Sequence, residues 1–269
     1  MPRFFLETVP EPGREVAFTG DDMHHISRSL RMAVGERVTV CDRKGAGYLC
    51  ELTAFLPDRV CARVIAPLAG SSEPPYRAEV FQALPKGDKL ETVIQKAVEC
   101  GACGIHPFQS ARCVARAGSG ESAARQQRRD RIALEAAKQS GRGMVPRVWP
   151  TADFAGALAL AAQANLPLLC YEGEDAEPLP AVLNRFLSGR QGRPAPPGQP
   201  LTVSVMVGSE GGFAPEEAAA ARAAGLLAVN LGPRILRTET AATFALACLS
   251  YALELSPEQQ IRQILPKTT

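Results

Sequence analysis

Beyond residue 75, short apolar runs alternate with amphipathic stretches. The apolar runs have the length of buried strands, and they lie at 78–84, 104–108, 166–171, 203–207 and 226–231. Stretches with helical spacing or helix start signals lie at about 89–100, 122–139, 149–162, from 215 onward, and at 238–255. This alternation of strands and helices predicts an α/β domain.

The first 70 residues show a different pattern. Four short segments with alternating apolar positions lie at 3–6, 37–42, 47–55 and 59–66, and glycine or charged turns separate them. Closely spaced short strands of this kind predict a small antiparallel barrel. One helix is predicted at 21–32, where Arg28 and Arg31 would share a face. Residues 67–75 have the composition of a linker, so we predict two domains, 1–70 and 76–269.

Two glycine-containing loops follow consecutive predicted strands near the end of the chain. The first, 208–213, reads Gly-Ser-Glu-Gly-Gly-Phe and precedes a helix that Pro215 opens. The second, 232–237, reads Gly-Pro-Arg-Ile-Leu-Arg and precedes a helix that begins at Thr238. Both loops therefore lie at the carboxyl ends of strands. In open α/β sheets ligands bind there, because loop amides and helix N-termini converge at that edge.

These two loops resemble the cofactor site of the SPOUT methyltransferases. The narrower resemblance is to the RsmE family of 16S ribosomal RNA (uracil-N3) methyltransferases, and it extends over almost the whole chain. It includes the run Pro-Lys-Gly-Asp-Lys at 85–89 and the run at 131–142, which covers the second half of the predicted helix 122–139 and ends in Arg142. The family usually has proline where this chain has Ser209. That difference concerns the rigidity of the loop more than its chemistry, because proline mainly fixes φ.

The resemblance implies a fold, a cofactor and an assembly. The fold is a PUA-like RNA-binding barrel joined to a SPOUT domain with a trefoil knot. The cofactor is S-adenosylmethionine (SAM), and the assembly is a homodimer built partly through the last helix, although that helix could also pack within one chain. The residues expected at the cofactor are Tyr171, Glu172, Gly208, Gly211, Gly212, Leu231, Gly232, Ile235, Leu236 and Thr238.

Methylation of uracil N3 requires removal of a weakly acidic proton that lies between two carbonyl groups. A guanidinium stabilises the resulting anion with fixed donors, and Arg237 is our first choice for this role. Glu210 or Glu239 is the candidate base, or the acid that orients Arg237. An acid at the start of a helix, as Glu239 is, also has a purely structural explanation.

Charge is unevenly placed along the chain. The net charge is only +2, yet the segment from Arg112 to Arg147 holds nine basic residues and three acids. Such an excess is typical of a face that binds phosphates, and a solvated helix surface explains it equally well. The family resemblance implies that the partner is 16S ribosomal RNA of the small ribosomal subunit. The candidate RNA-binding residues are Arg28, Arg31, Lys86, Lys89, Arg128, Arg129 and Arg142.

Composition limits the class of protein. Hydrophobic residues at 46% and charged residues at 22% are typical of a soluble globular protein, and no apolar run reaches the roughly 18 residues of a membrane span. No secretory segment follows Met1, so the eight cysteines favour cytosolic thiols and a cytoplasmic location. Zinc binding by Cys100, Cys103, His106 and Cys113 is the less favoured interpretation, because the chain has no second Cys-x-x-Cys pair, and we expect no metal. His106, next to a proline, is expected to be packed or on the surface rather than to act as a base.

Other functions remain open at this point. A methyltransferase of the same class could modify a ribose hydroxyl or transfer RNA, and a non-catalytic RNA-binding module is a further alternative. Phosphate-binding and dinucleotide-binding motifs of the P-loop and Rossmann types are absent from the sequence. The resemblance to the RsmE family implies a SAM-dependent enzyme that methylates uridine N3 in ribosomal RNA, and this is our prediction.

Overall fold

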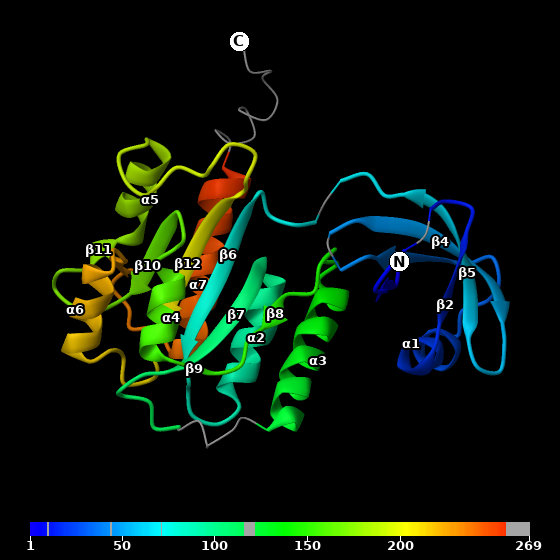
Figure 1. Ribbon diagram of the computed structural model, residues 1–269, viewed down its shortest axis with the longest axis horizontal. Helices are drawn as coiled ribbons and strands as arrows, with labels where there is room; N and C mark the ends of the chain where they lie inside the picture. Colours follow the sequence, from blue (N-terminus) through cyan, green and yellow to red (C-terminus); the bar gives the residue numbers. More distant parts are fainter. Residues whose placement is uncertain (10, 44, 71, 116–121, 257–269) are drawn as a thin grey trace, which may run out of the picture. The chain divides into compact units, whose positions relative to one another are not determined.

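The computed structural model describes residues 1–9, 11–43, 45–70, 72–115 and 122–256. The contacts between residues divide the chain into two compact units (Figure 1). The first unit is Met1–Glu73 with Ala137–Val145, and the second is Pro74–Ala136 with the described residues from Pro146 on. The change of unit after Glu73 lies inside the predicted linker. The return of 137–145 to the first unit has no counterpart in the sequence pattern.

The first unit contains a five-stranded sheet in the order β1-β3-β4-β5-β2. Its strands are β1 (Arg3–Phe5), β2 (Glu15–Phe18), β3 (Arg37–Cys41), β4 (Gly47–Phe55) and β5 (Val60–Pro67). All neighbours are antiparallel except β1, which runs parallel to β3. The prediction of an antiparallel arrangement is therefore wrong for β1. The reason is connectivity, because β2 and a helical segment separate β1 from β3 and provide the long crossover that a parallel pair needs.

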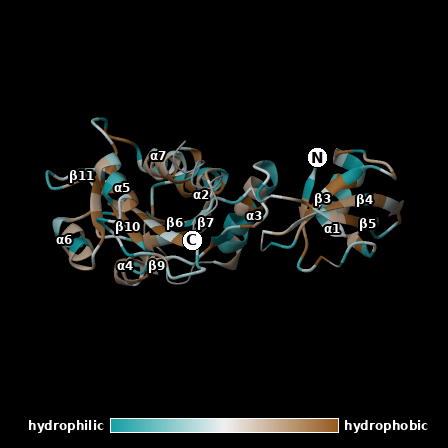
Figure 2. Cartoon of the chain, turned by 90° about the horizontal axis from the view of Figure 1, so that it is seen from above, coloured by the Kyte–Doolittle hydropathy of each residue, from teal (hydrophilic) through white to brown (hydrophobic). Residues whose placement is uncertain are grey.

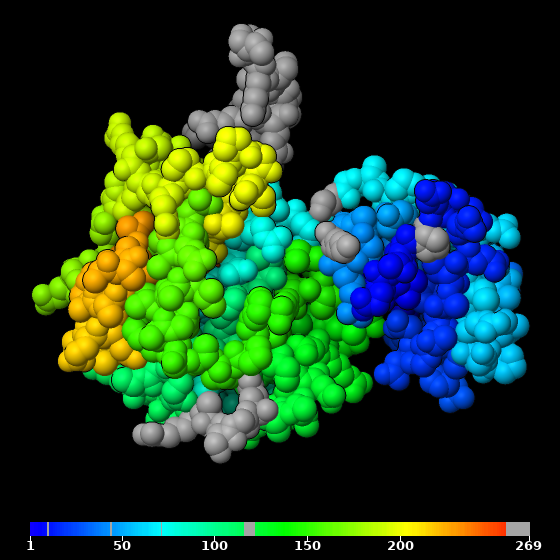
Figure 3. All heavy atoms as spheres, in the orientation of Figure 1, coloured from blue at the N-terminus to red at the C-terminus, as the bar shows by residue number. Residues whose placement is uncertain are grey.

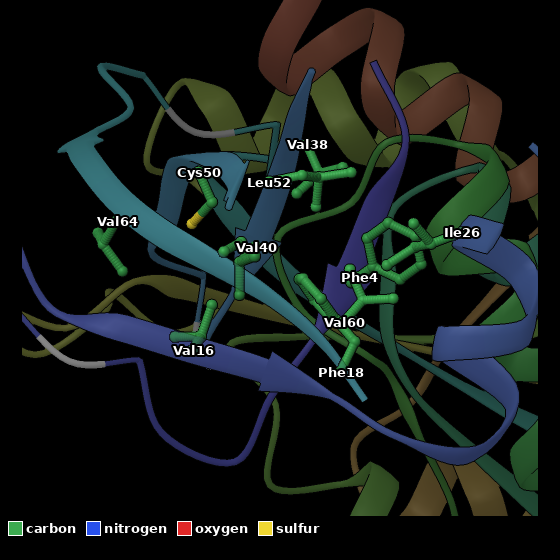
Figure 4. Close-up of a cluster of buried hydrophobic side chains, with 11 residues drawn as sticks. Phe4, Val16, Phe18, Ile26, Val38, Val40, Cys50, Leu52, Val60 and Val64 are labelled. Atoms are coloured by element: carbon green, nitrogen blue, oxygen red, sulfur yellow. The ribbon is translucent and has the colours of Figure 1, made fainter. Parts of the chain in front are cut away.

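The core of this sheet joins its two edges. Phe4 on β1 and Phe18 on β2 pack with ring centroids 5.0 Å apart, although β1 and β2 are the outermost strands. Side chains from all five strands point into this cluster, and Ile26 from the helical segment joins them (Figure 4). The sheet thus curls until its edge strands share one core, as in a small barrel.

The predicted helix at 21–32 is shorter and less regular. It consists of α1 (Gly20–His24) and a π-helical turn over His25–Ser29, in which Leu30 N donates to His25 O at 2.9 Å. The helix ends there, because Arg31 adopts a φ of 51° in the left-handed region. The prediction that Arg28 and Arg31 share one helical face is therefore wrong, although both side chains are exposed.

The segment 137–145 is held in the first unit by a buried ion pair. Arg142 is 3% exposed, and its Nε donates to Glu73 Oε2 at 2.9 Å. Glu73 Oε1 accepts from the amide of Gly143 at 2.8 Å. A guanidinium buried against a carboxylate is committed to that partner, because separating them would leave a charge unpaired in the interior. The prediction that Arg142 binds RNA is therefore wrong.

The second unit is built on an eight-stranded sheet with the order β11-β13-β10-β12-β6-β7-β8, and β9 also pairs with β7. The strands are β6 (Tyr76–Ala83), β7 (Ala102–Gln109), β8 (Arg147–Val148), β9 (Ala152–Asp153), β10 (Leu166–Cys170), β11 (Glu177–Pro178), β12 (Leu201–Val207) and β13 (Leu227–Asn230). Every pair in this sheet is parallel. The predicted α/β architecture is confirmed.

Helices cover both faces of this sheet (Figures 1 and 2). α2 (Lys89–Glu99) and α7 (Thr238–Ser250) lie on one face, and α4 (Phe154–Ala161) lies on the other. In the space-filling view, atoms of α4 cover the sheet and part of β6 remains visible beside them (Figure 3). The apolar stripe of α2 is fully buried, as its helical spacing predicts.

The other α-helices described beyond residue 100 are α3 (Ala123–Gln139), whose residues from Ala137 on belong to the first unit, α5 (Leu179–Leu187) and α6 (Pro215–Ala223). Two of the predicted helix bounds change. α5 was not among the predicted elements. α4 begins later than predicted, because 152–153 pair with β7 as β9 and Asp153 then caps the helix by accepting from Gly156 N at 2.7 Å. The last helix ends at Ser250 and continues as a π-helical turn over Tyr251–Leu255.

The strand order brings three loops to one edge of the sheet. β10 lies between β12 and β13, so that Cys170 pairs with Val207 on one side and with Val229 on the other. These residues are the last or nearly the last of their strands. The loops that begin at Tyr171, Gly208 and Leu231 therefore leave the sheet side by side.

Candidate cofactor and substrate site

A cavity of about 650 Å³ lies where these three loops meet. All ten residues predicted at the cofactor line it, and Glu210, Arg237 and Lys89 line it as well. Glu239, from the first turn of α7, is not among the lining residues, but its carboxylate reaches Lys89. The sequence thus brings its candidate residues together in space, from segments up to about 150 positions apart.

The loop after β12 forms a tight turn that depends on glycine. Gly212 has a φ of 66°, and its amide donates to Ser209 O at 2.9 Å. A Cβ atom at Gly208 would lie 3.0 Å from the backbone of Gly212. The absence of a side chain at 208 lets the two backbone segments approach this closely without strain. Backbone groups of this turn therefore form one wall of the cavity.

Two buried polar side chains fix the position of Gly208. Thr238 Oγ1 donates to Gly208 O at 2.6 Å, and Gln82 Nε2 donates to Thr238 Oγ1 at 2.8 Å. Gln82 is fully buried, and Thr238 is 5% exposed. This chain of hydrogen bonds ties β6 and α7 to the loop after β12. Gln82 was missed by the sequence analysis, although a glutamine inside an apolar strand is itself a signal of a buried polar contact.

The same loop is braced from the segment after β7. Ser209 Oγ donates to Arg112 O at 3.3 Å, and Arg112 Nη1 donates to Gly211 O at 3.0 Å. Glu217, 8% exposed, accepts from the amides of Ala111 and Ala214 at 2.8 and 2.9 Å. The hydroxyl of Ser209 thus supplies a bond that a proline could not make. Arg112, which the sequence analysis placed only in the basic segment, lines the cavity.

The loop after β13 provides an apolar surface. Gly232 adopts a φ of 103°, and its amide donates to Asn230 Oδ1 at 3.3 Å. Ile235 is 85% exposed although it is apolar, and it lines the cavity next to Leu236. An exposed isoleucine beside backbone polar groups fits a ligand with a flat apolar ring and a polar edge.

An ion-pair network of three charged side chains lies at the cavity. Lys89 Nζ is 2.8 Å from Glu210 Oε1 and 3.7 Å from Glu239 Oε2. Glu210 Oε1 also accepts from the amide of Lys86 at 3.1 Å. Burial alone would raise the pKa of Glu210, but the hydrogen bonds from Lys89 and from backbone amides outweigh it, so the pKa lies below its usual value. The hydrogen bond to Glu210 raises the pKa of Lys89.

Arg237 presents an uncommitted guanidinium. It precedes α7, and its backbone carbonyl accepts from Thr240 N and Ala241 N at 2.8 and 2.9 Å. Its side chain is exposed, lines the cavity and makes no hydrogen bond or ion pair within the described part of the chain. A planar group with five donors is therefore available to a ligand.

The other candidate RNA-binding residues are distributed over both units. Arg128 on α3 pairs with Glu91 at 2.7 Å, yet its side chain is 64% exposed. Arg129, one residue further, lies 3.4 Å from Thr151 Oγ1. Arg28 and Arg31 are exposed in the first unit. Lys86 and Lys89 belong instead to the loop and helix at the cavity.

His106 is packed, as predicted. Its ring stacks between Phe81 and Trp149, with centroid distances of 4.3 and 5.3 Å, and its Nε2 lies 3.1 Å from Glu79 Oε2. This stack leaves His106 no role as a base at the cavity. Among the residues that the structure describes, no three His, Cys, Asp or Glu side chains come together as a metal site requires. None of the described helices is both long and apolar enough to cross a membrane.

Comparison with protein families identifies the class of the chain. Residues 72–250 match the RNA methyltransferase domain, which accounts for more than half of the sequence. The chain belongs to this RNA methyltransferase family. Residues 18–65 match the RNA methyltransferase PUA domain, so the predicted PUA-like domain is confirmed.

Individual relatives of this RNA methyltransferase cover nearly its full length. Ribosomal RNA small subunit methyltransferase E from Bacillus subtilis is 34% identical over 95% of the chain and 98% of its own length. The protein of the same name from Mycobacterium bovis is 31% identical over 91% of this chain and 90% of its own length. The enzyme of that name from Neisseria gonorrhoeae, solved with SAM bound, is 32% identical and has a TM-score of 0.80. The match covers 93% of this chain and 97% of the Neisseria chain. The predicted methyltransferase class is confirmed, and the bound SAM supports the predicted cofactor.

Proposed function

We propose that this RNA methyltransferase uses SAM to methylate N3 of a uridine in 16S ribosomal RNA of the small ribosomal subunit. The observation that carries the proposal is the cavity where three strand-end loops meet, with Arg237 at its wall and without a partner among the described residues. The names of the relatives support a ribosomal RNA substrate. The choice of uridine N3 rests on the family resemblance and on the charges at the cavity.

The cavity fits an adenosyl cofactor. Its volume of about 650 Å³ lies within the range of roughly 300–1,000 Å³ typical of small-molecule sites. Backbone groups around Gly208, Gly212 and Gly232 would hold the ribose and the adenine edge, and Ile235 with Leu236 would cover the base. When bound, SAM supplies a methyl group attached to a sulfonium sulfur. The sulfur is the leaving group and becomes a neutral thioether.

Arg237 would stabilise the uracil anion. Loss of the N3 proton places negative charge on the ring and its two carbonyl oxygens. The guanidinium of Arg237 is exposed to the cavity and has no partner among the described residues, so it can donate to such an oxygen. Arg112 is less suited, because its Nη1 already donates to Gly211 O at 3.0 Å.

Glu239 is the better candidate for the proton acceptor. Glu210 accepts hydrogen bonds from Lys89 and from the Lys86 amide, and its lowered pKa makes it a weaker base. Glu239 Oε2 accepts no hydrogen bond within the described chain, and its side chain is 19% exposed. Glu210 would then hold the loop after β12 in place and orient Lys89.

RNA contacts outside the cavity would come from both units. Arg128 and Arg129 on α3 would contact the RNA backbone, and the PUA-like unit would bind flanking nucleotides. Single-stranded or extruded uridine is required, because N3 takes part in pairing inside a duplex. We expect a cytoplasmic enzyme, since ribosomal RNA is its substrate.

The SPOUT knot and the homodimer are also part of the proposal. Along the last helix and the turn after it, Phe244, Tyr251 and Leu255 are 36%, 68% and 56% exposed. Exposed apolar side chains on one helical segment support burial against a second copy. Light scattering would measure the mass in solution, and a monomer at working concentration would contradict the dimer.

Nucleoside mass spectrometry tests the reaction. Ribosomal RNA from a strain that lacks the gene is expected to lose 3-methyluridine, and purified protein with SAM is expected to restore it. Unchanged 3-methyluridine together with the loss of a ribose methyl group or of a transfer RNA modification would assign the enzyme to another substrate. Calorimetry that detects no SAM binding would instead indicate an RNA-binding module.

A further inference from the structure

Lys89 joins two acids from separate segments of the chain. It is the first residue of α2, and its ammonium lies between Glu210 of the loop after β12 and Glu239 of α7. The side chains of Lys89, Glu210 and Glu239 are 33%, 29% and 19% exposed. All three are thus partly shielded from water, where charge interactions are stronger than on an open surface.

The two contacts of the ammonium differ in kind. The distance of 2.8 Å to Glu210 Oε1 is a hydrogen bond, whereas the distance of 3.7 Å to Glu239 Oε2 is an ion pair only. Glu239 Oε2 is buried and has no hydrogen-bond partner within the described residues. The ammonium of Lys89 forms the ion pair with this oxygen. Without it, the carboxylates of Glu210 and Glu239 would have no cation between them.

The remaining charged groups around the cavity do not replace Lys89. Arg112, Arg234 and Arg237 line the cavity, and Glu172 adds one more acid. Arg237 is close enough to act on Lys89 electrostatically, but no ion pair joins it to either carboxylate in the part of the chain that the structure describes. The ammonium of Lys89 is therefore the group that balances Glu210 and Glu239 directly.

We propose that Lys89 is a positioning residue for proton transfer, which holds Glu210 and Glu239 as an ionised pair so that Glu239 can accept the uracil N3 proton. This inference rests on the proposed function and replaces the expectation that Lys89 binds RNA phosphate. In the step, the N3 proton moves to a carboxylate oxygen of Glu239. The electron pair left on N3 forms the bond to the methyl carbon, and the electrons of the broken carbon–sulfur bond remain on sulfur.

Removal of the ammonium has a defined effect on pH dependence. Glu239 must be ionised to act as a base, so the rate falls at pH values where it is protonated. Without Lys89, repulsion between the two carboxylates favours protonation of one of them. The acid limb of the pH–rate profile therefore moves to higher pH, whereas loss of a phosphate contact would weaken RNA binding at every pH.

The test compares Lys89→Met with a matched control on the same helix. Lys96→Met removes an ammonium that pairs with Glu99 at 2.7 Å and that does not line the cavity. Single-turnover methylation of uridine-containing RNA is followed between about pH 4 and 9, together with the Kd for SAM and for RNA. For Lys89→Met we expect the acid limb to rise by about one pH unit, with both Kd values within about twofold of wild type. Lys89→Arg should restore the profile, and Lys96→Met should not move it.

Several outcomes would overturn the inference. An unchanged profile with weaker RNA binding would make Lys89 a phosphate contact, and a tenfold weaker Kd for SAM would make it a cofactor contact. If Lys89→Met does not fold, Lys89→Gln provides the same loss of charge for the same comparison. Failure of wild-type protein to form 3-methyluridine would contradict the proposed function, whereas normal product with an unmoved profile in Lys89→Met would contradict only the role of Lys89.

Discussion

The hydroxyl of Thr238 donates a hydrogen bond of 2.6 Å to the carbonyl oxygen of Gly208, which lies 30 positions earlier in the chain. Thr238 begins α7, and Gly208 begins the loop after β12, so this bond joins the two loops that the sequence motifs identify. Gln82 donates to both partners, at 2.8 Å to Thr238 Oγ1 and at 3.3 Å to Gly208 O. The shape of the cavity therefore depends on a residue, Gln82, that belongs to neither motif.

Replacement of Thr238 by valine tests this connection. Valine keeps the shape but removes the hydroxyl that donates to Gly208 O, so that this buried carbonyl keeps only the longer bond from Gln82, at a cost of about 1–3 kcal/mol. We expect a lower melting temperature and a Kd for SAM raised by about tenfold, as thermal unfolding and calorimetry would measure. Thr238→Ser keeps the hydroxyl and should retain both values. Equal behaviour of the valine and serine variants would contradict the role of the bond.

The turn after β12 is expected to tolerate no side chain at its first position. A Cβ atom at Gly208 would meet the backbone of Gly212 at 3.0 Å, and backbone cannot move aside as a flexible side chain can. We expect Gly208→Ala to cost about 1–3 kcal/mol and to reduce SAM affinity by about tenfold or more in calorimetry. Gly104→Ala is the control, because its nearest neighbour is the flexible carboxylate of Glu79 at 3.4 Å, away from the cavity. Normal SAM binding by Gly208→Ala would disprove the tight turn.

The sequence separation of the interacting residues decides which parts of this fold could be predicted. Strands, glycine turns and the apolar face of α2 depend on neighbours within a few residues, and their patterns placed them within a few positions. The environment of Arg142 depends on Glu73, 69 positions away, so an arginine in a basic helix gave no sign that it would be 3% exposed. α5 carries the helical spacing of Leu179, Val182 and Leu183 but is short, and it was overlooked.

The candidate site divides in the same way. The glycines and Arg237 belong to contiguous motifs, and they line one cavity because the order β13-β10-β12 brings their loops together. That strand order is a long-range property. The family resemblance implied that the loops meet, whereas the spacing of residues in the sequence could not predict it. The pairing of Lys89 with Glu210 spans 121 positions, so the sequence analysis could only note a lysine at a helix start and assign it to RNA.

The ion pair between Glu210 and Lys89 predicts a pH window for stability. The pKa of Glu210 is lowered on folding, so its contribution is present above the unfolded value of about 4.3 and is lost as the pH falls through the folded value. The pKa of Lys89 is raised, so its contribution is present below about 10.4 and is lost as the pH rises through the folded value. Thermal unfolding of wild type and Glu210→Gln should therefore differ most between about pH 5 and 10 and converge at both extremes. A constant difference across the range would exclude the ion pair as its cause.

Arg237 is expected to act on the chemical step rather than on cofactor binding. Its guanidinium lines the cavity without a partner in the described chain, so its donors are available for charge that develops on the uracil ring. We expect Arg237→Ala to lower the single-turnover rate by about 100- to 1,000-fold while the Kd for SAM changes by less than about threefold. Arg237→Lys keeps the charge but not the planar fork of donors, so it should recover only part of the rate. A full rate with lysine would show that charge alone suffices, and a rate unaffected by alanine would transfer the stabilising role to another residue.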